Sequence, residues 1–348
     1  MIFLNHVYDM NKLISINPAT GKSNGSVNVS SLADIKRKVA AANKAKESWR
    51  RIGIAHRIEY VRRAYSLFQS RAEDIATIIT KEVGTPITEC RGEVAWDWSY
   101  LDWFLDTVEQ AIAPETIGED ASCIYTSTYE PLGTAAVITP WNLPFDLFLW
   151  GVIPNLLVGN TVIHKASEQC VLSGKLFADI MVEAKFPEGV FSAVHGDGVQ
   201  GAKLVDQDID LIWFTGSSSV GKTLYATAGK KFIRSLLEMG GSNAAILFED
   251  SDVDAAIPVL KFKRFAYCGQ TCDAVKRLLV HKKIFSQVVE TLRQEVEKIV
   301  LGDPMDPKSE IGPLVSVVQR DLLAAQVSDA VKKGAKIVIG GKKPARPG

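Results

Sequence analysis

The sequence predicts an α/β protein built on a parallel sheet, and two observations support that prediction. From Gly133 to Phe248, short apolar runs alternate with longer helical stretches. That rhythm is typical of βαβ units whose helices cover both faces of a sheet. In addition, two glycine-rich turns at 196–201 and 216–223 each follow an apolar run and open a helical stretch. Such strand-to-helix turns are where parallel sheets bind phosphate groups.

Composition bounds the class of protein. The 348 residues are 47% hydrophobic, and 40 basic residues balance 40 acidic ones. This predicts about two globular domains and argues against nucleic acid or an anionic membrane surface as the main partner. No segment is apolar over the roughly 18 residues of a membrane span, and the start lacks a basic leader. Five scattered cysteines indicate a reduced, cytoplasmic protein without a metal site: Cys90, Cys123, Cys170, Cys268 and Cys272.

The first third is predicted to be helical, over 30–49, 55–83 and 92–108. Ser30 and Ser31 can cap the first helix, and Gly84-Thr85-Pro86 ends the second. The third carries Trp96, Trp98 and Trp103, which we expect to serve core packing. Residues 122–130 alternate partly and predict an edge strand.

The middle of the chain supplies the parallel sheet. Strands are expected at 135–138, 160–164, 190–194, 211–214 and 244–248, and helices at 146–158, 171–184, 199–206 and 219–229. Ligands of such sheets bind at the carboxyl ends of the strands. The residues just after the runs, Trp141-Asn142, Lys165 and 215–217, are therefore candidates for a binding site.

After Asp252 helical stretches and short apolar runs alternate again. We expect a helix at 252–267, a strand at 274–281, helices at 285–300 and 316–333, and a strand at 335–339. The chain is thus divided into residues 1–251, with helices and a Rossmann-type domain, and residues 252–348, a partial second α/β domain.

The two glycine turns compete for a phosphate. Gly196 to Gly201 matches G-x-G-x-x-G, but Asp197 would repel a pyrophosphate. Gly216 to Thr223 offers hydroxyls and a helix N-terminus without an acid, which suits a dinucleotide better. It also matches the G-x-x-x-x-G-K-[ST] phosphate loop, so nucleotide triphosphate hydrolysis stays open as an alternative.

Cys272 follows Gly269-Gln270-Thr271, and Glu238 precedes Gly240-Gly241. A thiol needs a base or a lowered pKa to act as a nucleophile, and a carboxylate can supply the base. On its own, Cys272 fits a buried core thiol better than a nucleophile, because most free cysteines are small buried apolar residues.

Several motifs in order resemble the NAD(P)-dependent aldehyde dehydrogenase superfamily, with succinate-semialdehyde dehydrogenases as a conceivable subgroup. They are Pro140 to Phe145, Lys165 with Glu168, Gly216-Ser217 with Val220-Gly221, Leu237 to Gly241, and Gly269 to Cys272. The resemblance covers almost the whole chain. It implies that Cys272 attacks an aldehyde, that Asn142 stabilises the oxyanion, and that Glu238 activates the water that releases the acid.

The same resemblance implies a dinucleotide site. Lys165 would hold the cofactor ribose, and Glu168 beside it favours NAD over NADP because it repels a 2′-phosphate. The other expected cofactor contacts are Trp141, Gly216, Ser217, Val220 and Gly221.

The chain also departs from the family pattern. Asp273 follows Cys272 where the family has a small or apolar residue, and Tyr267 stands where many members have asparagine. A Glu-x-Phe-Gly-Pro stretch and a C-terminal assembly strand, through which full-length members form homo-oligomers, are not found. A shortened chain that binds NAD or a partner without turnover is therefore the alternative function.

Overall fold

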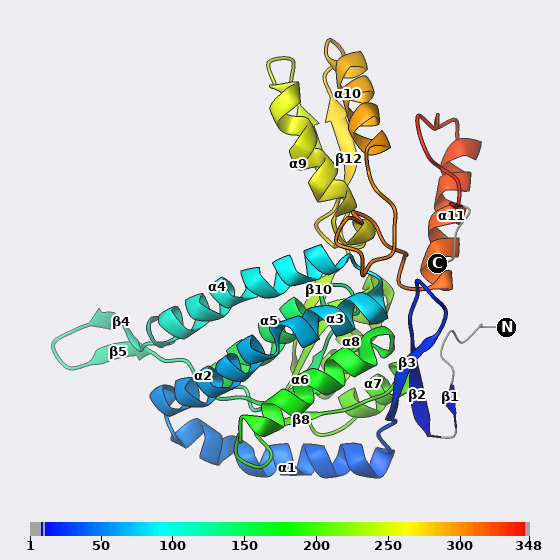
Figure 1. Cartoon of the computed structure of the whole chain (residues 1–348). Helices are drawn as coiled ribbons and strands as arrows, with labels where there is room; N and C mark the ends of the chain where they lie inside the picture. Colours follow the sequence, from blue (N-terminus) through cyan, green and yellow to red (C-terminus); the bar gives the residue numbers. More distant parts are fainter. Residues whose placement is uncertain (1–7, 10, 345–348) are drawn as a thin grey trace.

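A five-stranded parallel sheet forms the centre of the protein (Figure 1). The computed structural model describes residues 8–9 and 11–344. The strands follow the order β10-β9-β6-β7-β8, which confirms the predicted α/β class. Their bounds are Thr134–Ile138 for β6, Thr161–Lys165 for β7, Phe191–Ala193 for β8, Leu211–Gly216 for β9 and Arg234–Met239 for β10. The edge strand β10 was not predicted.

Helices cover both faces of this sheet because alternate side chains of each strand point to opposite sides. Ala136 and Ile163 pack with α1 (Leu32–Arg51), α7 (Gly198–Val205) and α8 (Ser218–Lys231). Their neighbours Val137 and Val162 belong to a larger cluster on the opposite face. That face is covered by α2 (Ile54–Ser70), α3 (Ala72–Val83), α4 (Ile87–Ala111), α5 (Pro144–Leu157) and α6 (Val171–Glu183).

The N-terminal helices follow the prediction closely. Ser31 caps α1 by accepting from the N–H of Asp34 at 3.1 Å. The stretch predicted as one helix is two, α2 and α3, separated at Arg71. The expected core role of the tryptophans holds only for Trp98, which packs against Phe145. Trp96 and Trp103 are both more than half exposed and lie on the outer side of α4, so that part of the prediction was wrong.

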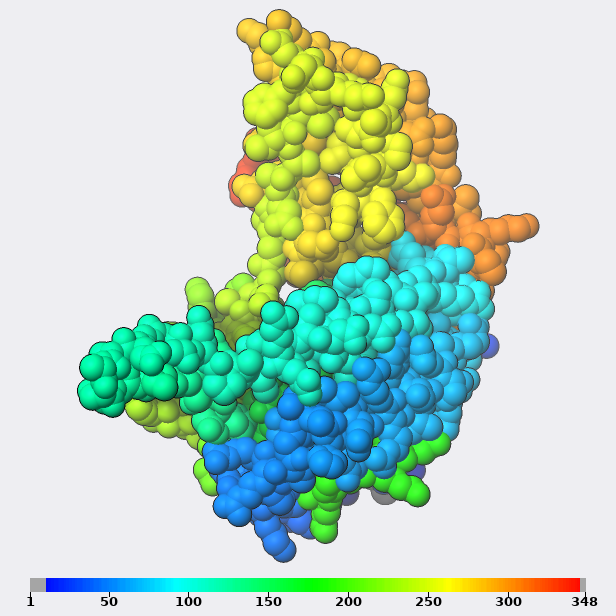
Figure 2. All heavy atoms as spheres, turned by 90° about the vertical axis from the view of Figure 1, so that its left-hand side faces the viewer, coloured from blue at the N-terminus to red at the C-terminus, as the bar shows by residue number. Residues whose placement is uncertain are grey.

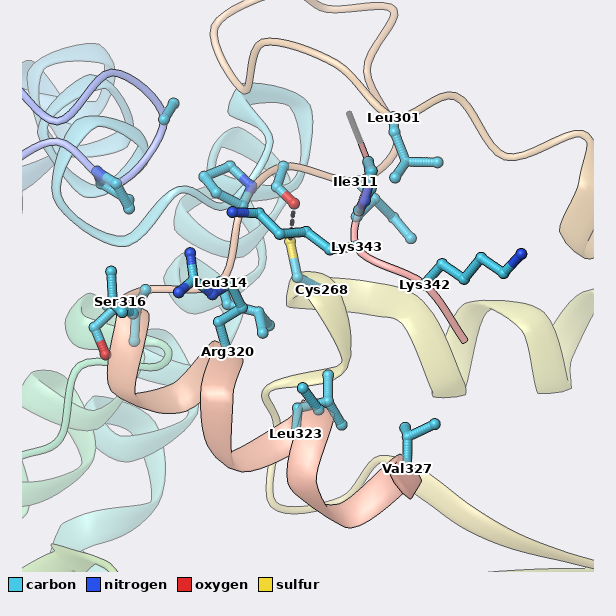
Figure 3. Close-up of a pocket in the computed structure, with 18 of the residues that line it drawn as sticks. Cys268, Leu301, Ile311, Leu314, Ser316, Arg320, Leu323, Val327, Lys342 and Lys343 are labelled. Carbon is cyan, nitrogen blue, oxygen red and sulfur yellow. Dashed lines mark hydrogen bonds between the residues drawn. The ribbon is translucent and has the colours of Figure 1, made fainter. Parts of the chain in front are cut away.

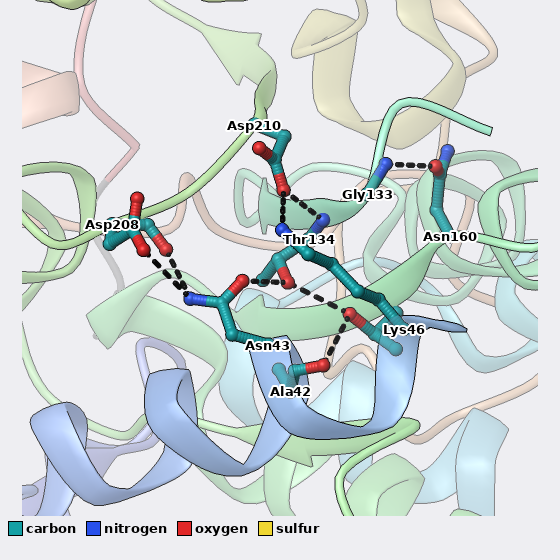
Figure 4. Close-up of polar contacts among 9 residues, drawn as sticks. Ala42, Asn43, Lys46, Gly133, Thr134, Asn160, Asp208 and Asp210 are labelled. Atoms are coloured by element: carbon teal, nitrogen blue, oxygen red, sulfur yellow. Dashed lines mark hydrogen bonds and ion pairs between the residues drawn. The ribbon is translucent and has the colours of Figure 1, made fainter. Parts of the chain in front are cut away.

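Polar side chains tie α1 to the amino ends of the strands (Figure 4). Asn43 donates to the Asp208 backbone at 2.8 Å, and its carbonyl oxygen accepts from the Thr134 hydroxyl at 2.8 Å. Asp210 accepts from the Thr134 N–H at 2.7 Å and pairs with Lys46 at 3.2 Å. These groups, of which Thr134 is buried, are satisfied by one another, and ligands of parallel sheets bind at the opposite, carboxyl ends of the strands.

Two small antiparallel sheets flank the body (Figure 1). β1 (Tyr8–Asp9), β2 (Lys12–Ile16) and β3 (Ser23–Asn28) form the first and were not predicted. β4 (Glu115–Glu119) and β5 (Ile124–Ser127) form a hairpin that projects from the end of α4. The strand expected at 122–130 is therefore present, but it pairs within this hairpin.

The remaining residues build an upper lobe that Figure 2 shows standing away from the body, with a notch beside α4. Two parallel strands, β11 (Asn243–Leu247) and β12 (Val275–Val280), pack with α9 (Val253–Phe265) and α10 (Phe285–Glu297). α11 (Val317–Lys332) stands apart from these elements (Figure 1). The strand expected at 335–339 is irregular chain. That expectation was wrong, because no described strand pairs with it and Ile337 and Val338 are exposed.

No helix among the described residues is long and apolar enough to cross a membrane. The same part of the chain holds no group of three or more His, Cys, Asp or Glu side chains arranged to bind a metal ion.

Candidate active site

The sheet register brings the predicted site residues to one edge. Ile138, the last residue of β6, pairs with Lys165 at the end of β7 and with Phe214 near the end of β9. Glu238 on β10 pairs with Thr215, and Met239 pairs with Gly216. Because the strands are parallel, their carboxyl ends and the turns that follow share this edge. Four separate motifs of the sequence therefore lie around one location.

The loop that carries Cys272 comes down against the residues after β10. A Cβ atom on Gly241 would lie 2.8 Å from the Cys272 carbonyl oxygen, so only glycine permits this approach. Lys276 Nζ donates to the Gly241 carbonyl at 2.6 Å and fixes the two segments. Cys272 and Glu238 are both exposed. The structure thus joins the two predicted catalytic segments three residues after Glu238.

A left-handed turn leads into Cys272. Tyr267 (φ 53°) and Cys268 (φ 58°) are consecutive non-glycine residues in the left-handed region, followed by Gly269 (φ 72°). Each non-glycine residue there costs about 1–2 kcal/mol, so contacts must hold the turn. Glu89 on α4 accepts from the Tyr267 N–H at 2.7 Å. The side chain of Gln270 accepts from the Val315 N–H at 3.1 Å.

Sequence reasoning did not find Glu89. Burial raises the pKa of its carboxyl group to about 7, and the Tyr267 N–H acts to lower it. A helix residue 183 positions before Cys272 carries no local signal of this role, since only the fold brings it to the loop.

Asp273, the unusual neighbour of Cys272, has a partner of its own. Lys263 Nζ lies 3.2 Å from its carboxylate, with both side chains about half exposed. Partial burial acts to raise the pKa of Asp273, but the hydrogen bonds from Thr271 and Lys263 outweigh it and hold the pKa below its ordinary value. The carboxylate is therefore ionised and turned toward α9.

Asn142 and Trp141 follow β6 and precede α5. Leu143 adopts a left-handed conformation (φ 63°) and Pro144 opens the helix, which fixes the direction in which the chain leaves the sheet. Trp141 is half buried against the larger core cluster. Asn142 is also half buried and lies in the turn that follows the carboxyl end of β6.

Lys165 is buried at the end of β7, where burial lowers the pKa of its amine. Its Nζ donates to the Ala166 carbonyl at 3.0 Å and lies 3.9 Å from Glu168. A buried amine at a strand end beside a half-buried carboxylate forms a polar pair that can hydrogen-bond ribose hydroxyls. These residues fit the predicted contact with a dinucleotide.

The favoured glycine turn passes directly into α8. Ser217 is the N-cap residue and its hydroxyl accepts from the Val220 N–H at 3.4 Å. A side chain at Gly216 would collide with Phe214, and one at Gly221 with Met239. Because α8 begins at Ser218, Lys222 and Thr223 lie within a helix. No extended loop can wrap a triphosphate here, which disfavours the hydrolase alternative.

The competing turn has a structural role. Asp197 caps α7 by accepting from the Val199 N–H at 2.8 Å, and Gln200 completes a capping box. The match to G-x-G-x-x-G at 196–201 is therefore explained by helix capping.

A cavity of about 1150 Å³ lies elsewhere, between α11 and the Cys268 turn (Figure 3). It is lined by Leu314, Leu323 and Val327 on one side and by Cys268 and Ile311 on the other. Of the predicted site residues only Glu168 reaches it. Its size reflects the unfilled space beside α11, and it does not contain the candidate nucleophile.

The chain is thus an α/β protein of the kind that binds dinucleotides, and a loop with a cysteine lies at the carboxyl edge of its sheet. The family model described as "Aldehyde dehydrogenase family" matches residues 7–348. The protein therefore belongs to the aldehyde dehydrogenase family, as the motifs predicted, and is classed with its NAD(P)-dependent enzymes.

Curated relatives agree with this assignment. Glutarate-semialdehyde dehydrogenase of Pseudomonas aeruginosa is 33% identical over 94% of this chain and 68% of its own length. Succinate-semialdehyde dehydrogenase [NADP(+)] GabD of Escherichia coli is 31% identical over 95% of this chain and 69% of its own. The chain therefore spans a little over two thirds of the length of these relatives.

Solved structures share the fold. PnpE, crystallised in complex with nicotinamide adenine dinucleotide, superposes with a TM-score of 0.92 at 32% identity, covering 96% of this chain and 69% of PnpE. An Escherichia coli NADP-dependent enzyme gives 0.92 at 31% identity, covering 96% and 70%. Relatives thus use either dinucleotide, which weighs against the expectation that NADP is disfavoured.

Proposed function

We propose that this protein oxidises an aldehyde to a carboxylic acid with NAD(P)+ through a covalent intermediate on Cys272. The observation that carries the proposal is the contact between the Glu238–Gly241 segment and the Cys272 loop at the carboxyl edge of the sheet. The homologous relatives support the same overall reaction.

Each residue of the candidate site has its own role in this reaction. The Cys272 sulfur attacks the aldehyde carbon and forms a thiohemiacetal. The Asn142 side-chain amide and the Cys272 N–H donate hydrogen bonds to the developing oxyanion. Bound NAD(P)+ supplies the hydride acceptor. Glu238 then removes a proton from water, which attacks the thioester and releases the acid.

The cofactor is proposed to lie across the ends of β7 and β9. Lys165 and Glu168 would bind a ribose, and Ser217 with the N–H groups of α8 would bind the pyrophosphate. The close packing of Gly216 and Gly221 lets the backbone approach, while Val220 and Trp141 provide apolar walls. Glu168 favours a free 2′-hydroxyl and hence NAD. A relative that uses NADP argues against a complete exclusion of NADP.

A second function is cofactor or partner binding without turnover. It is supported by apolar side chains of the upper lobe that stand exposed, including Ile246, Leu279 and Val317. Exposed apolar surface of this kind is a site of protein association. In this proposal residues 1–251 hold the dinucleotide and residues 252–348 form the partial catalytic domain.

Cys272→Ala tests the proposal, with Cys123→Ala, which changes another exposed cysteine, as the matched control. We expect NADH formation from a panel of aldehydes by the 348-residue chain and by the control, and none by Cys272→Ala. Turnover that survives in Cys272→Ala would overturn the mechanism. Calorimetric NAD binding with no turnover by the unmodified chain would instead establish the second function.

A further inference from the structure

The proposed nucleophile and its partners lie on two parts of the molecule. Cys272 belongs to the loop that leads from α9 into β12 of the upper lobe, whereas Asn142 and Glu238 belong to the body. A misplacement of reacting groups by about 1 Å can lower a rate about a hundredfold. The contacts that fix the Cys272 loop against the body therefore bear on the reaction.

The start of α4 joins these two parts. The Ile87 N–H donates to the Pro304 carbonyl of the upper lobe at 2.8 Å. A Cβ atom on Gly312 would collide with the Gly84 carbonyl oxygen, so the two segments pack without room for a side chain. The first turn of α4, which carries Glu89, is thus fixed against the upper lobe.

Glu89 reaches from this joint into the turn that leads to Cys272. Its Oε2 accepts from the Tyr267 N–H at 2.7 Å. The Tyr267 carbonyl accepts from the side chain of Gln270 at 3.2 Å. Both backbone polar groups of Tyr267 therefore have a side-chain partner, and one of these partners belongs to the body.

Two further hydrogen bonds of the turn stay within the upper lobe. The Gln270 side chain accepts from the Val315 N–H at 3.1 Å. Cys268 Sγ donates to the Gly312 carbonyl at 3.5 Å (Figure 3). Of these contacts, that of Glu89 is the one that joins the turn to the body.

The turn needs such an anchor because of its backbone conformation. Tyr267 and Cys268 both lie in the left-handed region, which a Cβ atom disfavours. A hydrogen bond to a carboxylate is roughly twice as strong as one between neutral groups. Without it, Tyr267 would be free to relax toward an ordinary conformation, and the chain that carries Cys272 five residues later would move with it.

We propose that Glu89 is a positioning residue that holds the Tyr267 turn, so that the upper lobe presents Cys272 to the reacting groups of the body. This inference rests on the proposed function and adds a residue to the same site. Glu89 acts through the backbone of the turn and takes no part in the chemistry. The ionised carboxylate is the stronger acceptor, so the turn is held most firmly when Glu89 carries no proton.

Protonation of Glu89 should weaken this hold. Burial raises the pKa of its carboxyl group to about 7, so the group takes up a proton below neutral pH. Glu89 also lines a cavity of about 400 Å³. The titratable groups beside it lie on α4, in the turn and along that cavity: Cys90, Glu93, Tyr267, Cys268, Lys261, Glu295 and Glu310. Lys261 pairs with Glu310 at 3.2 Å and so compensates that acid.

Hydrogen–deuterium exchange measures the hold without any turnover. Glu89→Asp keeps the charge but is shorter by one methylene, whereas Glu89→Gln keeps the length and an acceptor oxygen. We expect amide exchange over residues 266–273 to rise about tenfold in Glu89→Asp and about threefold in Glu89→Gln, with exchange in α10 unchanged. Glu109→Asp, at an exposed position of the same helix, should change neither. Unchanged exchange in Glu89→Asp, or an equal rise throughout the upper lobe, would overturn the proposal.

Turnover shows whether the hold serves the reaction. With an aldehyde that the chain oxidises, kcat should fall about tenfold in Glu89→Asp and less than about threefold in Glu89→Gln. KM for NAD should stay the same, because the proposed cofactor contacts lie at the ends of β7 and β9. An unchanged kcat in Glu89→Asp, or a loss that appears only in KM, would contradict the proposal.

The pH profile separates positioning from a purely structural role. Between pH 6 and pH 8, kcat of the unmodified chain should rise about threefold more than kcat of Glu89→Gln, whose side chain does not titrate. Coinciding profiles would overturn the proposal. Absence of turnover by the unmodified chain would overturn the proposed oxidation, whereas the exchange measurement still decides whether Glu89 holds the turn.

Discussion

Glu82 and Asp97 are both buried carboxyl groups, but their surroundings differ completely. Glu82 on α3 accepts three hydrogen bonds from the start of α6: from the Leu172 N–H at 2.9 Å, the Ser173 N–H at 2.7 Å and the Ser173 hydroxyl at 2.6 Å. Neither side-chain oxygen of Asp97 accepts a hydrogen bond from a donor of another described residue. Burial alone therefore does not reveal what a carboxyl group does. The donors around it distinguish a carboxyl group that anchors the fold from one that is left without partners.

The largest expected effect in the comparison of Glu82 with Asp97 comes from removing the Glu82 carboxyl group. Glu82→Ala would leave buried donors of Leu172 and Ser173 without an acceptor, and we expect a loss of about 3 kcal/mol in the free energy of unfolding. Urea denaturation would measure it. Glu109→Ala, an exposed glutamate on α4, should change stability by less than about 0.5 kcal/mol. A loss for Glu82→Ala no larger than that of the control would show that Glu82 is not an anchor.

The buried carboxyl group of Glu93 on α4, which lies near Asp97 and Asp146, should reveal itself through pH. The pKa of Glu93 is raised to about 8 in the folded protein, so the folded state holds a proton that the unfolded state, with a pKa near 4.3, has released. The stability from this group is fully present below that unfolded pKa and is lost as pH rises toward 8. Glu93→Gln should remove this loss.

Between pH 6 and pH 7, the unmodified chain should lose about 1.4 kcal/mol more of its unfolding free energy than Glu93→Gln does. Urea denaturation at the two pH values would give the difference. If the unfolding free energy changes equally with pH in the two chains, Glu93 has the same pKa in the folded protein as in the unfolded one.

The smallest expected change in stability comes from replacing the acid by its amide at Asp97 and at Glu82. Asp97→Asn replaces a buried acid that has no hydrogen-bond donor by an amide that can donate to Asp146, so stability should stay level or rise by up to about 1 kcal/mol. Glu82→Gln replaces one acceptor oxygen by an NH2 group that faces donors, so stability should fall by about 1 kcal/mol. Thermal unfolding of both variants measures the signs, and equal signs would remove the distinction between the sites.

Much of this architecture could be predicted from the sequence. Apolar runs marked β6, β7, β8 and β9, because strands buried on both faces leave continuous apolar stretches. Strand β10 was missed because its exposed and half-buried residues alternate around Glu238, which resembles a solvated segment. The tryptophans on α4 were misjudged in part because spacing gives the side of a helix without showing what covers that side.

The residues of the candidate site also fall into two groups, those that the sequence identified and those that it did not. Cys272, Glu238, Asn142, Lys165 and Ser217 follow strands or glycine turns, so local signals identified them. Glu89, Glu93, Asp97 and Asp146 look like ordinary helix residues in the sequence. Their burial and their approach to the cysteine loop arise only when α4 packs on α5, a contact that no local pattern encodes.

The division of the candidate site between two parts of the molecule has a consequence for how such an enzyme can diversify. The proposed nucleophile is carried by a loop of the upper lobe, whereas the proposed oxyanion donor and cofactor contacts are carried by the body. Mutations in the body can alter which cofactor is bound while the nucleophile stays untouched. The two parts of the protein can therefore evolve separately, with new selectivity added to an inherited reaction.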